Sequence, residues 1–187
     1  MRIIAGSAGR TPIKVPGSVT RPTTDFVRQA IFSILGEKIM NARVLDLFAG
    51  SGALGLEALS RGAASCTFVD QQRQATTIIQ QNLTKSKLEG GRIVNADVLS
   101  FLSREQQTYD VIFSDPPYWK HHGDVDWIDR LISKNAISPR LAPDGCWVVE
   151  MSTYQKTPET AGMQLLHRRE YGSSAVLIFS LLDDSAL

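Results

Sequence analysis

From residue 43 onward, short apolar runs alternate with stretches of helical periodicity. We expect strands over Val44–Phe48, Cys66–Val69, Arg92–Val94, Tyr109–Ser114 and Gly145–Glu150. The helices expected between them cover Ala53–Leu59, Arg73–Lys87, Val98–Leu102 and Trp127–Ile132. Strands that are apolar on both faces and alternate with helices are typical of a parallel sheet with helices on both sides. The pattern therefore predicts an α/β fold.

The two ends of the chain depart from this alternation. Gln164–Tyr171 and Ala175–Leu181 are separated by only three residues, too few for a crossover helix. We expect them to form an antiparallel hairpin that closes the sheet. Arg2–Ala5 and Ile13–Val15 predict a second, small hairpin. A helix is expected after Thr24, a residue type that caps helix N-termini.

Composition excludes several protein classes. The chain has 187 residues, of which 43% are hydrophobic and 21% charged, as expected for one globular domain. This composition excludes collagen-like, coiled-coil and broadly disordered proteins. No apolar run approaches the ~18 residues of a membrane span, and no secretory signal is evident. Cys66 and Cys146 lie in separate apolar runs. This spacing argues against a disulfide and favours a cytoplasmic location.

Charge is distributed unevenly along the chain. The whole protein has a net charge of +1, but residues 1–43 contain seven basic and two acidic residues, a net charge of +5. A basic segment on a mildly acidic body favours contact with a phosphate backbone. A solvated arm is the alternative interpretation. The candidate contacts are Arg2, Arg10, Lys14 and Arg28.

A glycine-rich loop follows the first expected strand. Gly50, Gly52 and Gly55 match G-x-G-x-x-G, and such a loop lets a ligand approach the main chain. The glycines alone do not distinguish a dinucleotide from another adenosine cofactor. Asp46, at the end of the strand, would repel a pyrophosphate but suits the sulfonium and ammonium groups of S-adenosylmethionine.

Two further carboxylates end the second and third expected strands. Asp70 is placed to accept the ribose hydroxyls of a cofactor, and Asp97 its adenine amino group, with the Val98 amide facing the ring. All three acidic residues then share one rim of the sheet, where open α/β folds bind ligands. For each aspartate alone, helix capping is the alternative. The predicted cofactor residues are Asp46, Phe48, Ala49, Gly50, Ser51, Gly52, Asp70, Gln71, Asp97 and Val98.

Asp115-Pro116-Pro117-Tyr118 follows the fourth expected strand. The amine of a nucleobase is a poor nucleophile because its lone pair is delocalised into the ring. The Asp115 carboxylate and the Pro116 carbonyl can accept its two hydrogens and turn the lone pair toward an electrophile. Tyr118 can stack on an extruded base. Asp115 is a candidate for both the catalytic residues and the cofactor-binding residues. A tight turn with a buried Tyr is the alternative.

Together these segments resemble the class I S-adenosylmethionine-dependent methyltransferases, most closely the RsmD-type family. The resemblance covers nearly the whole chain and includes Met1–Gly6 and Arg21–Arg28. It implies a seven-stranded sheet of order 3-2-1-4-5-7-6. It also implies that Arg21, Thr23 and Thr24 help hold the methionine end of the cofactor. The family usually has Glu at the position of Asp70, so this shorter side chain is expected to make a longer or water-bridged contact.

The resemblance implies methylation of guanine N2 in 16S ribosomal RNA, with guanine 966 as the family expectation. The partner would be this RNA, the small subunit or an assembly intermediate, contacted also by Trp119. We expect a monomer without metal or membrane, with an arm over residues 1–20 and a catalytic core over 21–187. The alternatives are an adenine-N6 DNA methyltransferase, an NAD-dependent oxidoreductase and a non-catalytic module that binds an adenosine cofactor or RNA.

Overall fold

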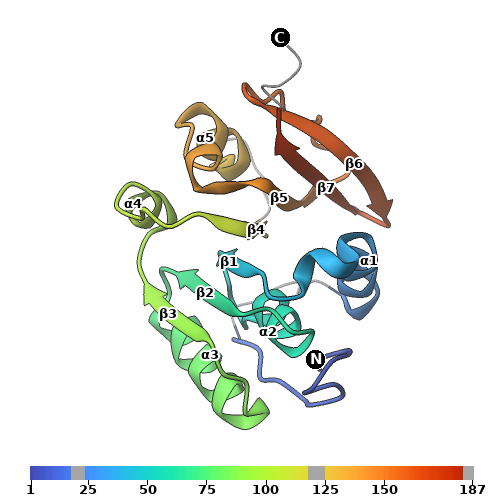
Figure 1. The fold of residues 1–187 in the computed structure, drawn as a ribbon, viewed down its shortest axis with the longest axis vertical. Coiled ribbons are helices and arrows are strands. Elements are labelled where there is room, and N and C mark those ends of the chain that lie inside the picture. Colours follow the sequence, from blue (N-terminus) through green and yellow to red (C-terminus); the bar gives the residue numbers. More distant parts are fainter. Residues whose placement is uncertain (18–23, 118–124, 183–187) are drawn as a thin grey trace.

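The computed structural model describes residues 1–17, 24–117 and 125–182, and is built around one seven-stranded sheet (Figure 1). The strand order is β3-β2-β1-β4-β5-β7-β6, as the resemblance implied. β1 to β5 are parallel, while β7 pairs antiparallel with both β5 and β6. The predicted closing hairpin is therefore confirmed. The strands are β1 Arg43–Leu47, β2 Ser65–Asp70, β3 Gly91–Asn95, β4 Tyr109–Ser114, β5 Leu141–Ser152, β6 Met163–Tyr171 and β7 Ser174–Leu181.

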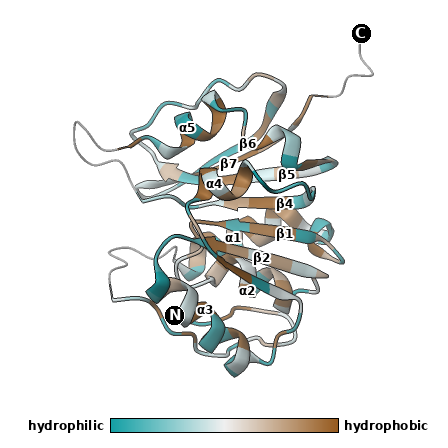
Figure 2. Ribbon diagram, turned by 90° about the vertical axis from the view of Figure 1, so that its left-hand side faces the viewer, coloured by the Kyte–Doolittle hydropathy of each residue, from teal (hydrophilic) through white to brown (hydrophobic). Residues whose placement is uncertain are grey.

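Helices cover both faces of the sheet. Alternate residues of each central strand enter different cores: Val44 packs with α1, α2 and α3, whereas Leu45 packs with α4 and α5. Hydrophobic positions dominate β1, β2 and β4 in Figure 2, because these strands are covered on both sides. The helices are α1 Asp25–Leu35, α2 Ala53–Ser60, α3 Arg73–Ser86, α4 Val98–Leu102 and α5 Trp127–Ser133, with short 3₁₀ helices at Gly36–Ile39 and Ser138–Arg140.

The N-terminal segment turns back on itself but forms less strand than the sequence predicts. The two expected strands are reduced to one antiparallel bridge between Arg2 and Pro12. The reason is that the intervening turn packs on the end of α2 and bonds to that helix. The Ser7 N–H donates to the Ser60 carbonyl at 2.7 Å, and a Cβ on Gly6 would collide with the same carbonyl.

Local signals place α1 correctly. The Thr24 side chain accepts a hydrogen bond from the Val27 N–H at 3.3 Å, which confirms the predicted cap. The helix ends before Gly36, whose φ of 52° suits glycine. Within residues 1–17, 24–117 and 125–182, no helix has the length and apolar character needed to cross a membrane.

Candidate functional site

The ends of β1, β2, β3 and β4 lie in register at one edge of the sheet. Leu47 of β1 pairs with Val69 of β2 and with Ser114 of β4. The next residue along each strand is therefore a neighbour of the others: Phe48, Asp70 and Asp115. The acidic-proline turn after β4 and the glycine loop after β1 consequently meet on adjacent strands, as the predicted site requires.

The glycine loop is open to a ligand at one glycine and closely packed at another. A Cβ on Gly50 would meet only the Phe48 carbonyl oxygen, 3.9 Å away, so the backbone there is accessible. A Cβ on Gly55 would instead collide with the ring of Phe68 and the Sγ of Cys66. Gly55 thus allows α2 to pack tightly on β2, whereas Gly50 leaves room for a bound group.

Asp46 is a buried carboxyl at the base of the loop. Asp46 is only 2% exposed, and its Oδ2 accepts a hydrogen bond from the Gly55 N–H at 3.0 Å. Burial raises the pKa of Asp46 to about 8; the Gly55 hydrogen bond opposes this rise and the Asp70 charge adds to it. A positively charged ligand would favour the ionised form of this carboxyl. A pyrophosphate would be repelled by that form.

Asp70 connects β2 to the glycine loop. Its Oδ2 accepts the Gly50 N–H at 2.9 Å and its Oδ1 accepts the Gln72 N–H at 2.8 Å. A carboxylate oxygen can accept more than one hydrogen bond, so these contacts leave acceptor capacity for a hydroxyl. The shorter Asp side chain thereby orders the loop, while Gln71 beside it is exposed.

Asp97 caps a helix, which was the alternative interpretation of this residue. Its Oδ1 accepts the Ser100 N–H at 2.9 Å and caps α4, whose first residue, Val98, is buried. Asp97 itself is half-buried at the sheet edge, beyond the end of β3. Capping engages Oδ1, and a carboxylate has two acceptor oxygens, so capping and contact with an adenine amino group are compatible.

The turn after β4 has a rigid, well-anchored start. The Trp147 indole N–H donates to Ser114 Oγ at 2.9 Å in the core, which fixes the strand end. Asp115 is half-buried and Pro116 buried, and Pro117 is exposed. Both prolines line a small cavity of about 10 Å³ together with residues of α5 and the end of β5.

Glu150 is a site residue that the sequence reasoning missed. The register pairs Ser114 with Val149, so Glu150 follows on β5 as Asp115 follows on β4. Glu150 is 5% exposed and lines the same cavity as the two prolines. The signal was available, because Glu150 ends an apolar run of the sequence as Asp70 does after Cys66–Val69.

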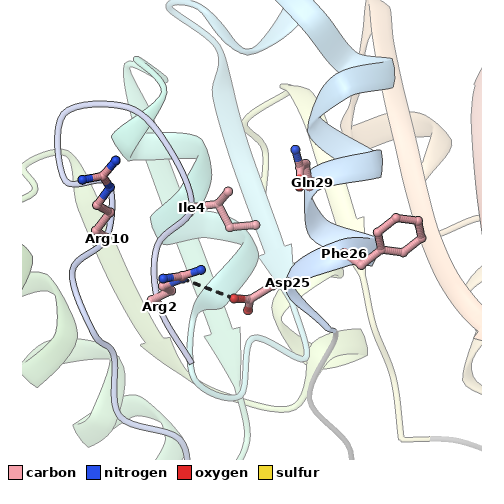
Figure 3. Close-up of a pocket in the computed structure, with 6 residues that line it drawn as sticks. All are labelled: Arg2, Ile4, Arg10, Asp25, Phe26 and Gln29. Carbon is pink, nitrogen blue, oxygen red and sulfur yellow. Dashed lines mark ion pairs between the residues drawn. The ribbon is translucent and has the colours of Figure 1, made fainter.

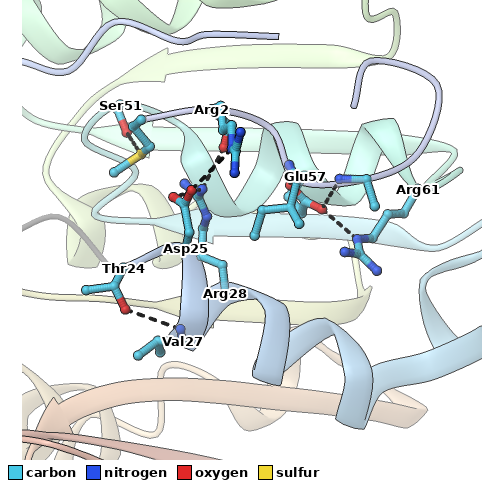
Figure 4. A network of polar contacts seen from close by, with 11 residues as sticks. Arg2, Thr24, Asp25, Val27, Arg28, Ser51, Glu57 and Arg61 are labelled. Carbon is cyan, nitrogen blue, oxygen red and sulfur yellow. Dashed lines mark hydrogen bonds and ion pairs between the residues drawn. The ribbon is translucent and has the colours of Figure 1, made fainter. Parts of the chain in front are cut away.

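An aromatic pair borders the glycine loop. The rings of Phe48 and Trp127 lie 5.3 Å apart at 61°, joining the loop to α5. Trp127 is half-buried, because it lies at the N-terminus of α5. Ser51, also in the loop, is buried, and its hydroxyl lies 3.8 Å from Met1 Sδ (Figure 4).

Arg28 is the one basic candidate that the structure contradicts. Its side chain is fully buried, and Nη2 donates to the Arg2 carbonyl at 2.6 Å and to Asp25 Oδ1 at 2.9 Å (Figure 4). Burial lowers the pKa of the Arg28 guanidinium, and Asp25 and Glu57 partly offset this. Arg28 therefore attaches the N-terminal segment to α1, and its predicted contact with RNA is wrong. Arg2, Arg10 and Lys14 are exposed.

Four predicted site residues lie outside the described residues: Arg21, Thr23, Tyr118 and Trp119. Ala49, in the described loop, is buried, and its N–H donates to the Val69 carbonyl at 3.1 Å. In the part of the chain that the structure describes, no three His, Cys, Asp or Glu side chains group to hold a metal ion.

The fold and this edge together define a class of enzyme. The strand order with its antiparallel closing hairpin, the accessible Gly50 backbone and the buried Asp46 carboxyl suit a cationic adenosine cofactor. These are the features of a class I methyltransferase that uses S-adenosylmethionine.

Comparison with known proteins identifies the family. The family described as "Conserved hypothetical protein 95" matches residues 1–180. YlbH of Bacillus subtilis (strain 168), provisionally named an rRNA methyltransferase, is 37% identical over 96% of this chain and 98% of its own length. "Ribosomal RNA small subunit methyltransferase D" of Escherichia coli (strain K12) is 36% identical over 91% of this chain and 84% of that protein. The solved structure of yhhF from Escherichia coli, provisionally described as a methyltransferase, has a TM-score of 0.82 and 34% identity over 97% of both chains. The chain belongs to this family, the RsmD-type methyltransferases.

Proposed function

We propose that this protein methylates the exocyclic N2 of a guanine in 16S ribosomal RNA, with guanine 966 as the expected position. The observation that carries the proposal is the pairing of Leu47 with Ser114, which puts the Asp115 turn beside the glycine loop. The name of the Escherichia coli relative supports an RNA of the small ribosomal subunit. The substrate is this RNA, the small subunit or its assembly intermediate, and the protein acts as a monomer.

The cofactor is held along the rim formed by the strand ends. The Asp46 carboxylate and the backbone of Gly50–Gly52 face the methionine group, together with Arg21, Thr23 and Thr24. Asp70 accepts the ribose hydroxyls, and Asp97 with the Val98 amide reads the adenine. These roles rest on the charges and on the order of the strands at one edge. Bound S-adenosylmethionine supplies an activated methyl group on its sulfonium.

The acidic-proline turn prepares the nucleophile. Asp115 and the Pro116 carbonyl accept the two hydrogens of the guanine amine, so that the nitrogen lone pair points along the sulfur–methyl bond. As the nitrogen–carbon bond forms and the sulfur–carbon bond breaks, Asp115 receives the proton that the nitrogen releases. Tyr118 stacks on the extruded base. Catalysis arises mainly from positioning, because the methyl group is already activated.

Glu150 supports guanine over adenine as the target. Guanine presents an N1–H donor next to its N2 amine, whereas adenine presents an N1 acceptor next to its N6 amine. Two acceptor carboxylates on adjacent strands match the guanine edge, and the second would face the lone pair of adenine N1. The pairing of Ser114 with Val149, which makes Glu150 the neighbour of Asp115, supports this assignment.

The test is methyl transfer to defined nucleic acids. We expect labelling of 16S RNA or small subunits that lack the modification, and none of duplex DNA; labelling of DNA alone would contradict the proposal. Mass-spectrometric mapping of RNA from cells with and without the protein then locates the nucleotide. Asp115→Ala should abolish transfer and retain cofactor binding, whereas Glu159→Ala, a change at an exposed acidic residue, should leave both intact.

A further inference from the structure

We infer that a pocket between the N-terminal segment and α1 binds one nucleotide of the RNA that flanks the target guanine. This inference rests on the proposed function. The pocket has a volume of about 280 Å³ and is lined by Arg2, Ile4, Arg10, Asp25, Phe26 and Gln29 (Figure 3). Sites for small molecules begin at roughly 300 Å³, so this volume suits one nucleotide and no duplex.

Phe26 provides an aromatic surface for a base. It is 68% exposed, whereas its neighbour Val27 and the later Ile31 and Phe32 of the same helix are at most 4% exposed. Tyr171 of β6 supports the Phe26 ring edge-on, with centroids 5.6 Å apart at 80°. Such a contact orients the ring while leaving most of it in solvent. Bases stack on exposed aromatic side chains regardless of sequence.

Two guanidinium groups at the pocket are available to bind a phosphate. Arg2 and Arg10, both in the N-terminal segment, line the same pocket (Figure 3). The Arg2 ion pair with Asp25 is long, at 3.6 Å, and its side chains are 64% and 49% exposed, so it is weak and open to competition. Among the described residues, no ion pair involves Arg10, whose N–H donates to the Ile3 carbonyl at 2.8 Å. The backbone bond holds Arg10 in the turn and leaves its charge for a ligand.

Gln29 completes a nucleotide-like set of partners. It lies one turn after Phe26 on α1, and an amide side chain offers both a donor and an acceptor to a base edge. An acidic peptide would use the two arginines but would gain little from an exposed phenyl ring beside an amide. The combination of a stacking surface, an amide and two guanidinium groups therefore favours a nucleotide.

The pocket is physically joined to the cofactor edge. Arg2 follows Met1, whose Sδ contacts the Ser51 hydroxyl of the glycine loop at 3.8 Å. Arg28 clamps the Arg2 carbonyl from below (Figure 4). A nucleotide bound beside Arg2 therefore lies close to the glycine loop. The pocket thus orients the strand that carries the target base.

Phe26 variants test the stacking. Loss of one base–aromatic stack, worth about 1–3 kcal/mol, weakens association roughly 5- to 140-fold, so Phe26→Leu should raise KM for RNA by that factor. The kcat at saturating RNA and the affinity for S-adenosylmethionine should stay unchanged. Phe26→Trp should restore RNA binding, and its fluorescence should be quenched by a single-stranded oligonucleotide of the substrate sequence. Met40→Ala, at another exposed apolar residue, is the matched control.

Arg10→Gln tests the phosphate contact. The slope of log affinity for RNA against log salt concentration should become about one unit less steep, as expected for the loss of one phosphate contact. An unchanged KM in Phe26→Leu, or no quenching in Phe26→Trp, overturns the inference while wild-type methylation of RNA preserves the proposed function. A defect seen only with assembled subunits and absent with naked RNA also overturns it, because the pocket would then bind a protein. Failure of the wild type to methylate any RNA refutes the proposed function itself.

Discussion

Cofactor binding should release a proton from Asp46. This carboxyl is buried, and its pKa is raised to about 8. At pH 7 roughly nine tenths of the ligand-free protein therefore has a neutral Asp46. The sulfonium and ammonium groups of the cofactor favour the carboxylate, because opposite charges stabilise each other strongly away from water. Binding must then expel the proton that burial had retained.

The size of the effect follows from this pKa. If the ionised form is the binding form, the apparent affinity should increase by about fiftyfold between pH 6 and pH 8 and level off above pH 8. The stability of the ligand-free protein should change in the opposite direction. The folded state holds the proton to higher pH than the unfolded chain, so the stability contributed by Asp46 decreases as pH rises from about 4 to about 8.

Isothermal titration calorimetry at pH 7, in two buffers of different ionisation enthalpy, counts the released protons. We expect close to one proton for the wild type and none for Asp46→Asn, whose affinity should be weak and independent of pH. Asp144→Asn, at an exposed position, should behave as the wild type. A proton count near zero together with constant affinity from pH 6 to 8 would refute the reasoning. Release that persists in Asp46→Asn would assign the proton to another group.

Three further variants probe packing and specificity. Gly55→Ala should lower the free energy of unfolding by about 1–3 kcal/mol in urea titrations, because its Cβ collides with Phe68; unchanged stability would contradict the close packing of α2 on β2. Arg28→Ala should lower the free energy of unfolding by about 3 kcal/mol, the low end for a broken buried ion pair, because its partner Asp25 is half-exposed. It should also increase proteolysis of the N-terminal segment. A loss within about 0.5 kcal/mol would show that Arg28 does not attach this segment to α1. Glu150→Gln should reduce kcat/KM for RNA by about five- to thirtyfold at unchanged cofactor affinity, and equal rates in both proteins would rule out contact with the base.

The features that depend on neighbouring residues could be predicted from the amino-acid sequence alone. Apolar runs between helical stretches predicted the parallel strands, and a three-residue gap predicted the closing hairpin. Thr24 marked the start of α1 through its own side chain. The glycine spacing located the loop after β1, and the strand-end carboxylates Asp46 and Asp70 marked the edge where it lies. These signals are local because backbone conformation, capping and strand alternation involve residues a few positions apart.

Which side chains are buried, and which groups bury them, depends on contacts between distant parts of the chain. Phe26 and Arg28 are two residues apart on α1, and their residue types alone favour the apolar side chain inside and the cation outside. The reverse is observed: Nη2 of the buried Arg28 donates to the Arg2 carbonyl and to Asp25, whereas Phe26 is 68% exposed among the described residues. Glu150 likewise joins Asp115 only through the pairing of β4 with β5. Such contacts join residues far apart in the chain, so their energies depend on the assembled sheet and are invisible to local pattern.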